Sequence, residues 1–166
     1  MAVDAEAPNR VAPVLDGSGM RIAVLCARFN DLITNRLLDG ARRGLGEAGV
    51  ADADVTVAWV PGAFELPFAA KAHAESGRFD AVIVLGAVIR GETTHYDIVG
   101  GECARGVQDV QLATGVPVLF GVLTTEDLPQ ALARSEEPGG HNVGEECGLG
   151  AVEVIGLIRP LREKMA

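Results

Sequence analysis

The chain of 166 residues has the length of a single domain, and its composition, 48% hydrophobic and 22% charged, is that of a globular protein with a buried core. The formal net charge of −9, from 14 basic and 23 acidic side chains, argues against nucleic acid or an anionic membrane as the partner, because both require clustered Lys and Arg. The three cysteines are widely separated and form no C-x-x-C pair, so neither a disulfide framework nor a zinc site is indicated, and a reducing cytoplasm fits best. The N-terminus lacks the basic and apolar segments of a signal peptide, and no apolar run has the length of a membrane span.

The first 19 residues are rich in Ala, Pro, Asp and Gly and show no periodicity. This composition predicts a flexible N-terminal arm, of a kind that can order against a partner subunit. Residues 20–166 are then expected to form one domain, without internal repeats.

Four apolar runs of strand length follow the arm, at residues 21–27, 54–60, 81–87 and 117–123. Runs that are apolar throughout are typical of parallel strands whose two faces are both covered. Helices are predicted where apolar residues recur every three or four positions. They are a helix from Ile33 to Ala48 that Gly49 ends, one from Leu66 to His73 with Pro67 in its first turn, one from just beyond Asp97 to Ala113, a short one from Leu128 to about Ser135, and a last one through Ala151 and Ile158 that Pro160 should end or kink.

Strands that alternate with helices predict an α/β fold, since parallel neighbours must be joined by crossover connections. The expected architecture has three layers, with a four-stranded parallel sheet between two layers of helices. The turns after the four strands leave the sheet at one edge, so their residues can converge on one ligand. These turns hold Phe29 with Asn30, residues 62–65, residues 88–95 and residues 124–126.

The stretch at residues 86–97 carries the most chemical groups, with two glycines, an arginine, two threonines and a histidine. The sequence Gly91-Glu92-Thr93-Thr94 before a helix can bind phosphate through backbone N–H groups, helped by the positive end of the helix. The alternative is an ordinary turn in which a threonine caps the helix, since the segment is neither a Walker loop nor G-x-G-x-x-G. His95 could act as a general acid or base near neutral pH, or could simply cap the helix.

Three other candidate residues, Phe29, Glu65 and Arg134, each have two interpretations. Phe29, directly after a strand, could stack on a planar heterocycle or belong to the core. Glu65 could accept hydrogen bonds from sugar hydroxyls or interact with the helix dipole. Arg134, in the last turn of the short helix, could bind an anion or interact with the helix dipole, and Arg90 could be only a surface salt-bridge partner. Three scattered histidines do not indicate a metal site.

Four blocks of residues, in this order along the chain, resemble the family of 6,7-dimethyl-8-ribityllumazine synthase, the penultimate enzyme of riboflavin biosynthesis. They are ARFN at 27–30, VPGAFELP at 60–67, GAVIRGETTHYD at 86–97, and FGVLTTE at 120–126 followed by Gln130, Ala131 and Arg134. The resemblance extends from about Arg21 to the C-terminus, and it implies a flavodoxin-like sheet.

The resemblance also implies a transferase that condenses 5-amino-6-(D-ribitylamino)uracil with 3,4-dihydroxy-2-butanone 4-phosphate, releasing phosphate and water. It implies small-molecule substrates, no cofactor and no metal. Such a condensation needs orientation and proton transfer more than a nucleophile, which agrees with a sequence that shows no Ser or Cys triad pattern. Family members assemble into homopentamers, decamers or sixty-subunit shells with active sites at subunit interfaces. The linker 135–141 looks slightly longer than in shell-forming members, which favours pentamers or decamers.

Roles for individual residues follow from the same resemblance. Those that would hold the pyrimidine and its ribityl chain are Phe29, Asn30, Gly62, Ala63, Phe64, Glu65, Val88 and Ile89. Those that would meet the phosphate are Gly91, Glu92 and Thr93. His95 would transfer protons, and the neighbouring subunit would supply Phe120 and Arg134.

The chain departs from the family pattern at Val143, where members usually have a lysine that contributes to pyrimidine binding. A lumazine- or flavin-binding or shell-forming paralogue with weak turnover is therefore a second interpretation. A third is a generic flavodoxin-like binding module, which would be a monomer.

Overall fold

The structure of the protein, a computed structural model, describes residues 11–165; residue 166 and residues 1–10, which belong to the predicted arm, lie outside them. Its sheet has four parallel strands in the order β2-β1-β3-β4. The strands are β1 (Ile22–Ala27), β2 (Val55–Val60), β3 (Ala81–Ile89) and β4 (Val118–Thr125). The predicted α/β class and four-stranded parallel sheet are confirmed.

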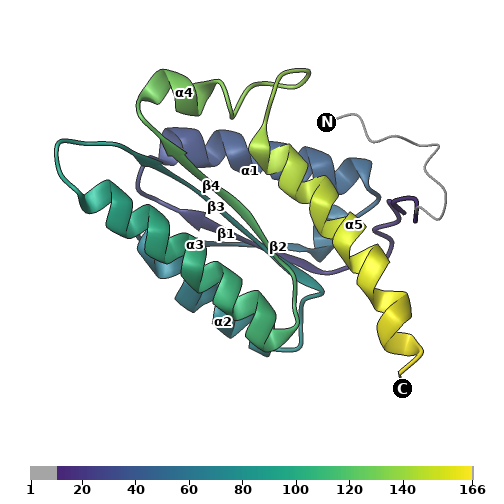
Figure 1. The fold of residues 1–166 in the computed structure, drawn as a ribbon. Helices are drawn as coiled ribbons and strands as arrows, with labels where there is room; N and C mark the ends of the chain where they lie inside the picture. The colour runs from purple at the N-terminus through teal and green to yellow at the C-terminus, as the bar shows by residue number, and fades with distance from the viewer. Residues whose placement is uncertain (1–10, 166) are drawn as a thin grey trace.

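Helices cover both faces of the sheet and give the predicted three layers (Figure 1). One face carries α1 (Asp31–Glu47) and α5 (Val143–Glu163), and the other carries α2 (Leu66–Glu75) and α3 (His95–Thr114). The short helix α4 (Leu128–Leu132) follows β4, and 3-10 turns at Asp52–Asp54 and Ala63–Glu65 precede β2 and α2. None of the helices within residues 11–165 is long and apolar enough to cross a membrane.

The central strands explain the continuous apolar runs in the sequence. All six residues of β1 and the first seven of β3 are buried, because helices pack on both sides of these strands. The outer strands are less covered, and Trp59 on β2 and Phe120 on β4 are both more than a third exposed. The sheet therefore has a covered centre and two partly open edges.

The stretch after β3 forms a shorter turn than predicted. β3 continues to Ile89, because its last two residues pair with the last two of β4. α3 begins at His95, and not beyond Asp97, which lies in its first turn. A negative side chain is favoured there by the helix dipole. The turn between strand and helix is thus reduced to residues 90–94.

The predicted short helix also ends earlier than expected, at Leu132 rather than near Ser135. Arg134 consequently lies in the turn after α4 and not in the helix. Ser135 forms an antiparallel bridge with Asn142, the buried N-cap residue of α5. Loop 136–141 is closed at its base by this bridge.

The prediction that Pro160 ends or kinks the last helix is wrong in its first part, because α5 continues to Glu163. Proline removes one backbone hydrogen bond from a helix interior. The turns around it are fixed to the amino end of the sheet by two contacts: Arg159 pairs with Asp80 at 3.2 Å, and Arg162 donates to the carbonyl of Gly115. These contacts hold the last turns in place beyond the proline.

Helices α1 and α5 approach each other so closely that several glycines between them have no room for a Cβ atom. A Cβ on Gly44 would overlap the backbone oxygen of Glu145, and a Cβ on Gly144 would overlap that of Leu37. Gly148 is similarly confined, since its Cβ would lie 2.6 Å from the oxygen of Ala41. Only glycine fits at these positions without moving one helix away from the other.

Replacing a glycine of this contact should therefore destabilise the protein. We expect Gly44→Ala to lower the free energy of unfolding by about 1–3 kcal/mol, because the added methyl group forces the backbones apart. Gly46, exposed on the same helix with no atom within 4 Å of its Cβ position, provides the control. Gly46→Ala should leave stability unchanged or raise it by up to about 1 kcal/mol. Urea unfolding of both variants checks this, and equal effects would contradict the proposed close contact.

Burial suppresses ionisation of all three cysteines. It raises the pKa of Cys26 and Cys147 to about 12 and that of Cys103 to about 11, from an ordinary value of 9.0. The main cause is desolvation of the thiolate, and the negative charge of Glu146 adds to it at Cys147. The three thiols are thus packing groups in this fold.

These shifts predict a loss of stability in alkali. Below the pKa of the thiols in the unfolded state, the thiols are protonated in both states, and their stabilising effect is complete. Above about pH 9 the thiols of the unfolded state ionise first, and the free energy of unfolding falls. Each thiol contributes up to about 1.4 kcal/mol per pH unit to this slope. Urea unfolding over this pH range should show a shallower slope for Cys103→Ala than for the wild type. An unchanged slope would mean that Cys103 is accessible to solvent.

Candidate functional site

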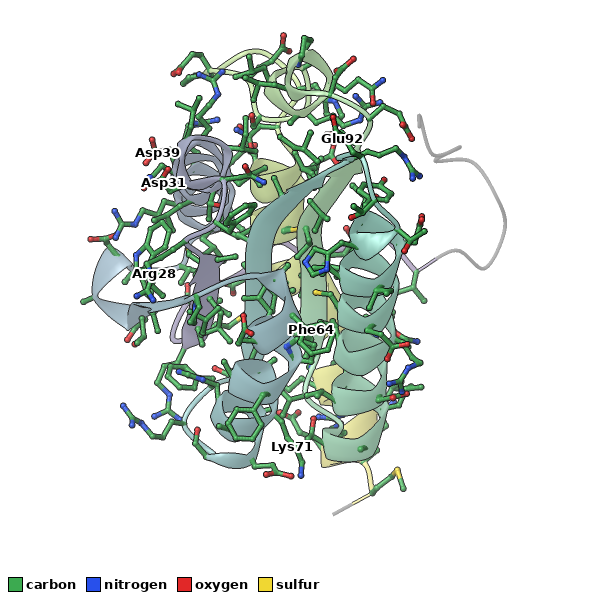
Figure 2. The ribbon with its side chains drawn as sticks, turned by 90° about the vertical axis from the view of Figure 1, so that its left-hand side faces the viewer. Arg28, Asp31, Asp39, Phe64, Lys71 and Glu92 are labelled. Carbon is green, nitrogen blue, oxygen red and sulfur yellow. The ribbon has the colours of Figure 1, made fainter. Side chains whose placement is uncertain are left out.

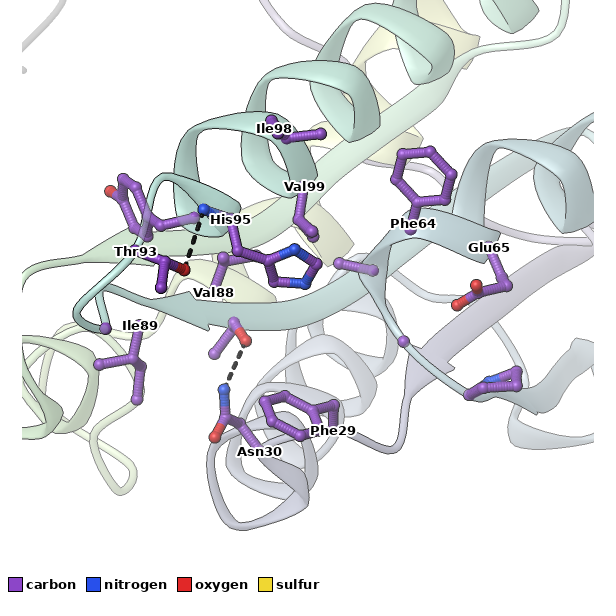
Figure 3. A pocket seen from close by; sticks show the side chains of 16 residues that line it. Phe29, Asn30, Phe64, Glu65, Val88, Ile89, Thr93, His95, Ile98 and Val99 are labelled. Carbon is purple, nitrogen blue, oxygen red and sulfur yellow. Dashed lines mark hydrogen bonds between the residues drawn. The ribbon is translucent and has the colours of Figure 1, made fainter.

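A pocket lies at the carboxyl edge of the sheet, where the order of the strands reverses. β1 is followed by α1 on one face of the sheet and β3 by α3 on the other, which opens a crevice between the two strand ends. The pocket has a volume of about 610 Å³ and is shown in Figure 3. It is lined by Phe29, Asn30, Pro61, Gly62, Ala63, Phe64, Glu65, Ala87, Val88, Ile89, Gly91, Thr93, His95, Tyr96, Ile98 and Val99.

The lining combines apolar walls with a few polar groups, which is the usual composition of a small-molecule site. Phe29 and Phe64 are 73% and 56% exposed, and they lie on different sides of the pocket (Figure 3). An aromatic ring that remains exposed after folding is available to stack on a ligand. Phe29 is therefore not a core residue of this chain, which was the alternative interpretation.

Asn30 fixes the turn that presents Phe29. Its backbone is left-handed, with φ at 62°, and its side-chain amide donates to the carbonyl of Ala87 at 2.8 Å. The backbone N–H of Phe29 donates to Pro61 at 3.2 Å. The turn after β1 is thus tied to the end of β3 and to the turn after β2, the two segments that flank it in the pocket.

Glu65 offers a carboxylate to the pocket from the turn after β2. Its backbone N–H donates to Gly62, which closes the 3-10 turn, and its side chain is exposed and points along the pocket wall (Figure 3). In the described part of the chain this carboxylate makes no capping hydrogen bond to α2. A free acceptor at this position fits the interpretation that it binds hydroxyl groups.

Residues 91–94 form an exposed turn at the N-terminus of α3. Thr94 occupies the N-cap position without a side-chain bond to the helix, while the hydroxyl of Thr93 accepts from the N–H of His95 at 3.3 Å. Of the two threonines, only Thr93 makes the hydrogen bond to the helix that the capping interpretation requires. The positive end of this twenty-residue helix points toward the turn, as anion binding requires.

His95 is the first residue of α3 and its imidazole extends into the pocket beside Val88 and Val99 (Figure 3). The ring makes no hydrogen bond with any residue in the range 11–165, so both nitrogens can reach a ligand. His95 is the first residue of the helix and Thr94 occupies the N-cap position, so the interpretation of His95 as a capping residue is excluded.

Eleven of the fourteen predicted site residues line the pocket, and Glu92, Phe120 and Arg134 do not. Glu92 is exposed on the turn before α3, above the start of that helix in the view of Figure 2. Phe120 lies on the outer strand β4, opposite Val84 and about 17 Å before the end of that strand. Arg134 is exposed, and its guanidinium donates to the backbone oxygen of Gln130 at 3.0 Å.

Five lining residues were absent from the predicted set. Pro61, Ala87 and Tyr96 lie within the sequence blocks that indicated the site, next to predicted residues. Ile98 and Val99 follow His95 by three and four positions and share its side of α3. They could be identified only if the helix were known to begin at His95.

The sequence matches the family model for 6,7-dimethyl-8-ribityllumazine synthase over residues 19–159. The chain belongs to this family. Lumazine synthases are transferases of riboflavin biosynthesis, and the three-layer fold found here agrees with theirs. Because the chain belongs to this family, the interpretation as a generic flavodoxin-like module is excluded.

The role of Asn30 can be tested by separating its two contributions. Asn30→Gly keeps the left-handed backbone accessible but removes the bond to Ala87, and should lower the free energy of unfolding by about 1–2 kcal/mol. Asn30→Ala removes the bond and also strains the backbone, and should cost about 1–2 kcal/mol more. Asn35→Ala, at an exposed position of the same helix, should change stability by less than about 0.5 kcal/mol. Equal losses for the Gly and Ala variants in urea unfolding would argue against backbone strain.

Proposed function

We propose that this protein condenses 5-amino-6-(D-ribitylamino)uracil with 3,4-dihydroxy-2-butanone 4-phosphate to 6,7-dimethyl-8-ribityllumazine, with release of phosphate and water. The observation that carries the proposal is the convergence of an exposed aromatic ring, a free carboxylate, a helix N-terminus and a histidine in one pocket. The proposal places the reaction in the cytoplasm, where the three thiols would stay reduced.

Each part of the two substrates has a matching group in the pocket. Phe29 would stack on the pyrimidine ring, with Val88 and Ile89 along its edge. Glu65 would accept hydrogen bonds from the ribityl hydroxyls. The backbone N–H groups of residues 91–93 would bind the phosphate at the positive end of α3.

The chemistry requires proton transfer in a fixed geometry. Condensation of an amine with a carbonyl, loss of phosphate and ring closure all move protons between nitrogen and oxygen atoms. An imidazole can serve each step, because it can both accept and donate a proton. His95, with its ring in the pocket and its nitrogens available, would take this role.

The active site is proposed to be completed by a neighbouring subunit in a homopentamer or a larger homo-oligomer. Large apolar side chains remain exposed in the single chain, among them Phe68 on α2 at 83% and Leu112 on α3 at 73%. Exposed apolar groups of this size indicate surfaces that associate. Phe120 and Arg134 lie outside their own chain's pocket, so they are free to enter that of a neighbour.

An arginine supplied in this way would solve an electrostatic problem. The chain has a net charge of −9, and the phosphate substrate is itself an anion. A guanidinium from Arg134 could form paired hydrogen bonds with the phosphate and offset the repulsion locally. Glu92, exposed within the turn at residues 91–94, would face the incoming segment.

A second candidate function follows from Val143. This residue begins α5 and is half-buried against the core between α1 and α5, where the family usually places a lysine. Without that cation the protein could bind lumazine or flavin and turn over weakly. Tight ligand binding with negligible turnover would favour this second function over the synthase.

The shared site predicts that two impaired variants can restore each other's activity at a concentration of the phosphate substrate near the wild-type KM. His95→Ala should lower kcat by up to about 10²-fold, and Arg134→Ala should raise the KM of the phosphate substrate about tenfold or more with assembly intact. In oligomers reassembled from both variants, about a quarter of the sites pair an intact pocket with an intact Arg134, and that share of activity should return. Lumazine fluorescence and released phosphate measure it.

The matched control mixes Arg134→Ala with Phe120→Ala. Both residues would be supplied by the neighbouring subunit, so no combination of these two variants forms a complete site. The mixture should be no more active than the two variants measured separately. Recovery in this control, or none in the first mixture, would show that the site is not shared as proposed. A wild-type protein that fails to accelerate the condensation would refute the synthase itself.

A further inference from the structure

Arg90 occupies a junction that the proposed reaction does not use. Its backbone N–H donates to the carbonyl of Thr125 at 2.9 Å, one residue beyond the last paired position of β3. It immediately precedes the phosphate turn at residues 91–94. Its side chain does not line the pocket formed by the described residues.

The guanidinium of Arg90 joins two segments on either side of that turn. Its Nε lies 2.9 Å from a carboxylate oxygen of Glu126, directly after β4, and its Nη2 lies 3.5 Å from Asp97, in the first turn of α3. The cation also stacks 4.2 Å from the centre of the Tyr96 ring. One side chain thus links the ends of β3 and β4 to the start of α3.

We propose that Arg90 is a positioning residue that holds residues 91–94 in the conformation that binds phosphate. The inference rests on the synthase function proposed above, and it concerns a residue that acts through the turn and does not touch the substrate. The ion pair with Glu126 fixes the position of the strand end, and the contacts with Asp97 and Tyr96 fix the position of the helix start. The turn between them is held from both sides.

The turn needs such external support because it has little of its own. All four of its residues are exposed, and no atom lies within 4 Å of the Cβ position of Gly91. Its side-chain bond to the helix is the one from the N–H of His95 to Thr93. A glycine-containing segment without packing loses much conformational freedom when a ligand orders it.

The geometry also explains why arginine is needed. A planar guanidinium can donate to two carboxylates and stack on a ring at the same time, whereas the ammonium group of lysine offers a single point charge. The hydrogen bond to Glu126 raises the pKa of Arg90 above its ordinary value, so the cation persists. Exposed ion pairs add little to global stability, so the effect should appear in ligand binding.

The experiment uses the assembled protein with Arg90→Gln, Arg90→Lys and Glu126→Gln. Affinity for a ligand falls in proportion to the population of the binding conformation. If this population falls about tenfold, binding becomes about tenfold weaker. We expect Arg90→Gln and Glu126→Gln to raise the KM of the phosphate substrate, and the Kd of inorganic phosphate, by about this factor, with Arg90→Lys between them and the wild type. The KM of the pyrimidine and the melting temperature should stay nearly constant.

Glu126→Gln separates positioning from a direct charge effect. It removes a negative charge near the turn, so electrostatics alone would strengthen anion binding. Positioning predicts the opposite sign. The control is Arg105→Gln, on the exposed side of α3, where Arg105 also pairs with two carboxylates, Glu102 and Asp109, and no change is expected.

Stronger or unchanged phosphate binding in Glu126→Gln would overturn the inference, as would equal changes of both KM values in Arg90→Gln. Failure of the synthase proposal has a different signature, because the wild type would then show no turnover. The Kd of inorganic phosphate, measured by calorimetric titration of the same variants, would still decide the role of Arg90 in that case.

Discussion

The backbone contact between α1 and α5 is the constraint on which one half of the molecule depends. Gly44 and Gly144 allow the two helices to touch along their backbones, so their separation is fixed by atoms that cannot change rotamer. α1 begins directly after Asn30, and its position therefore determines where Phe29 enters the pocket. A packing feature of the core thus controls the placement of the aromatic wall of the site.

The crevice that forms the pocket depends on the topology of the sheet. Because β1 and β3 lie side by side and send their following helices to opposite faces, the crevice between their ends cannot be filled by the chain's own connections. Asn30 bridges it at the base through the carbonyl of Ala87, and Arg90 fixes the far rim. The site is consequently a gap between the ends of two well-packed strands, next to the exposed turn at residues 91–94.

The sequence predicted the fold well because the central strands are buried on both faces, so their residues are apolar without exception. It failed at the start of α3, where Thr94, His95 and Asp97 show no apolar periodicity and the helix is stabilised by its dipole and by the bond from the N–H of His95 to Thr93. Most pocket residues could be predicted from their position after the strands. The position of Phe120 and Arg134 outside the pocket could not be predicted in this way, because periodicity does not show where the side chains of an outer strand and a turn lie relative to a cavity.

The bridge between Ser135 and Asn142 has a consequence for the evolution of the chain. Loop 136–141 leaves and re-enters the fold at this one bridge, and the N–H of Val143 donates to the carbonyl of Arg134 at 2.9 Å just beneath it. Residues inserted into or deleted from the loop would change only the part that projects outward, since closing a longer loop costs little entropy. The outer contour of the chain can therefore diverge among relatives while Arg134 and the start of α5 keep their places.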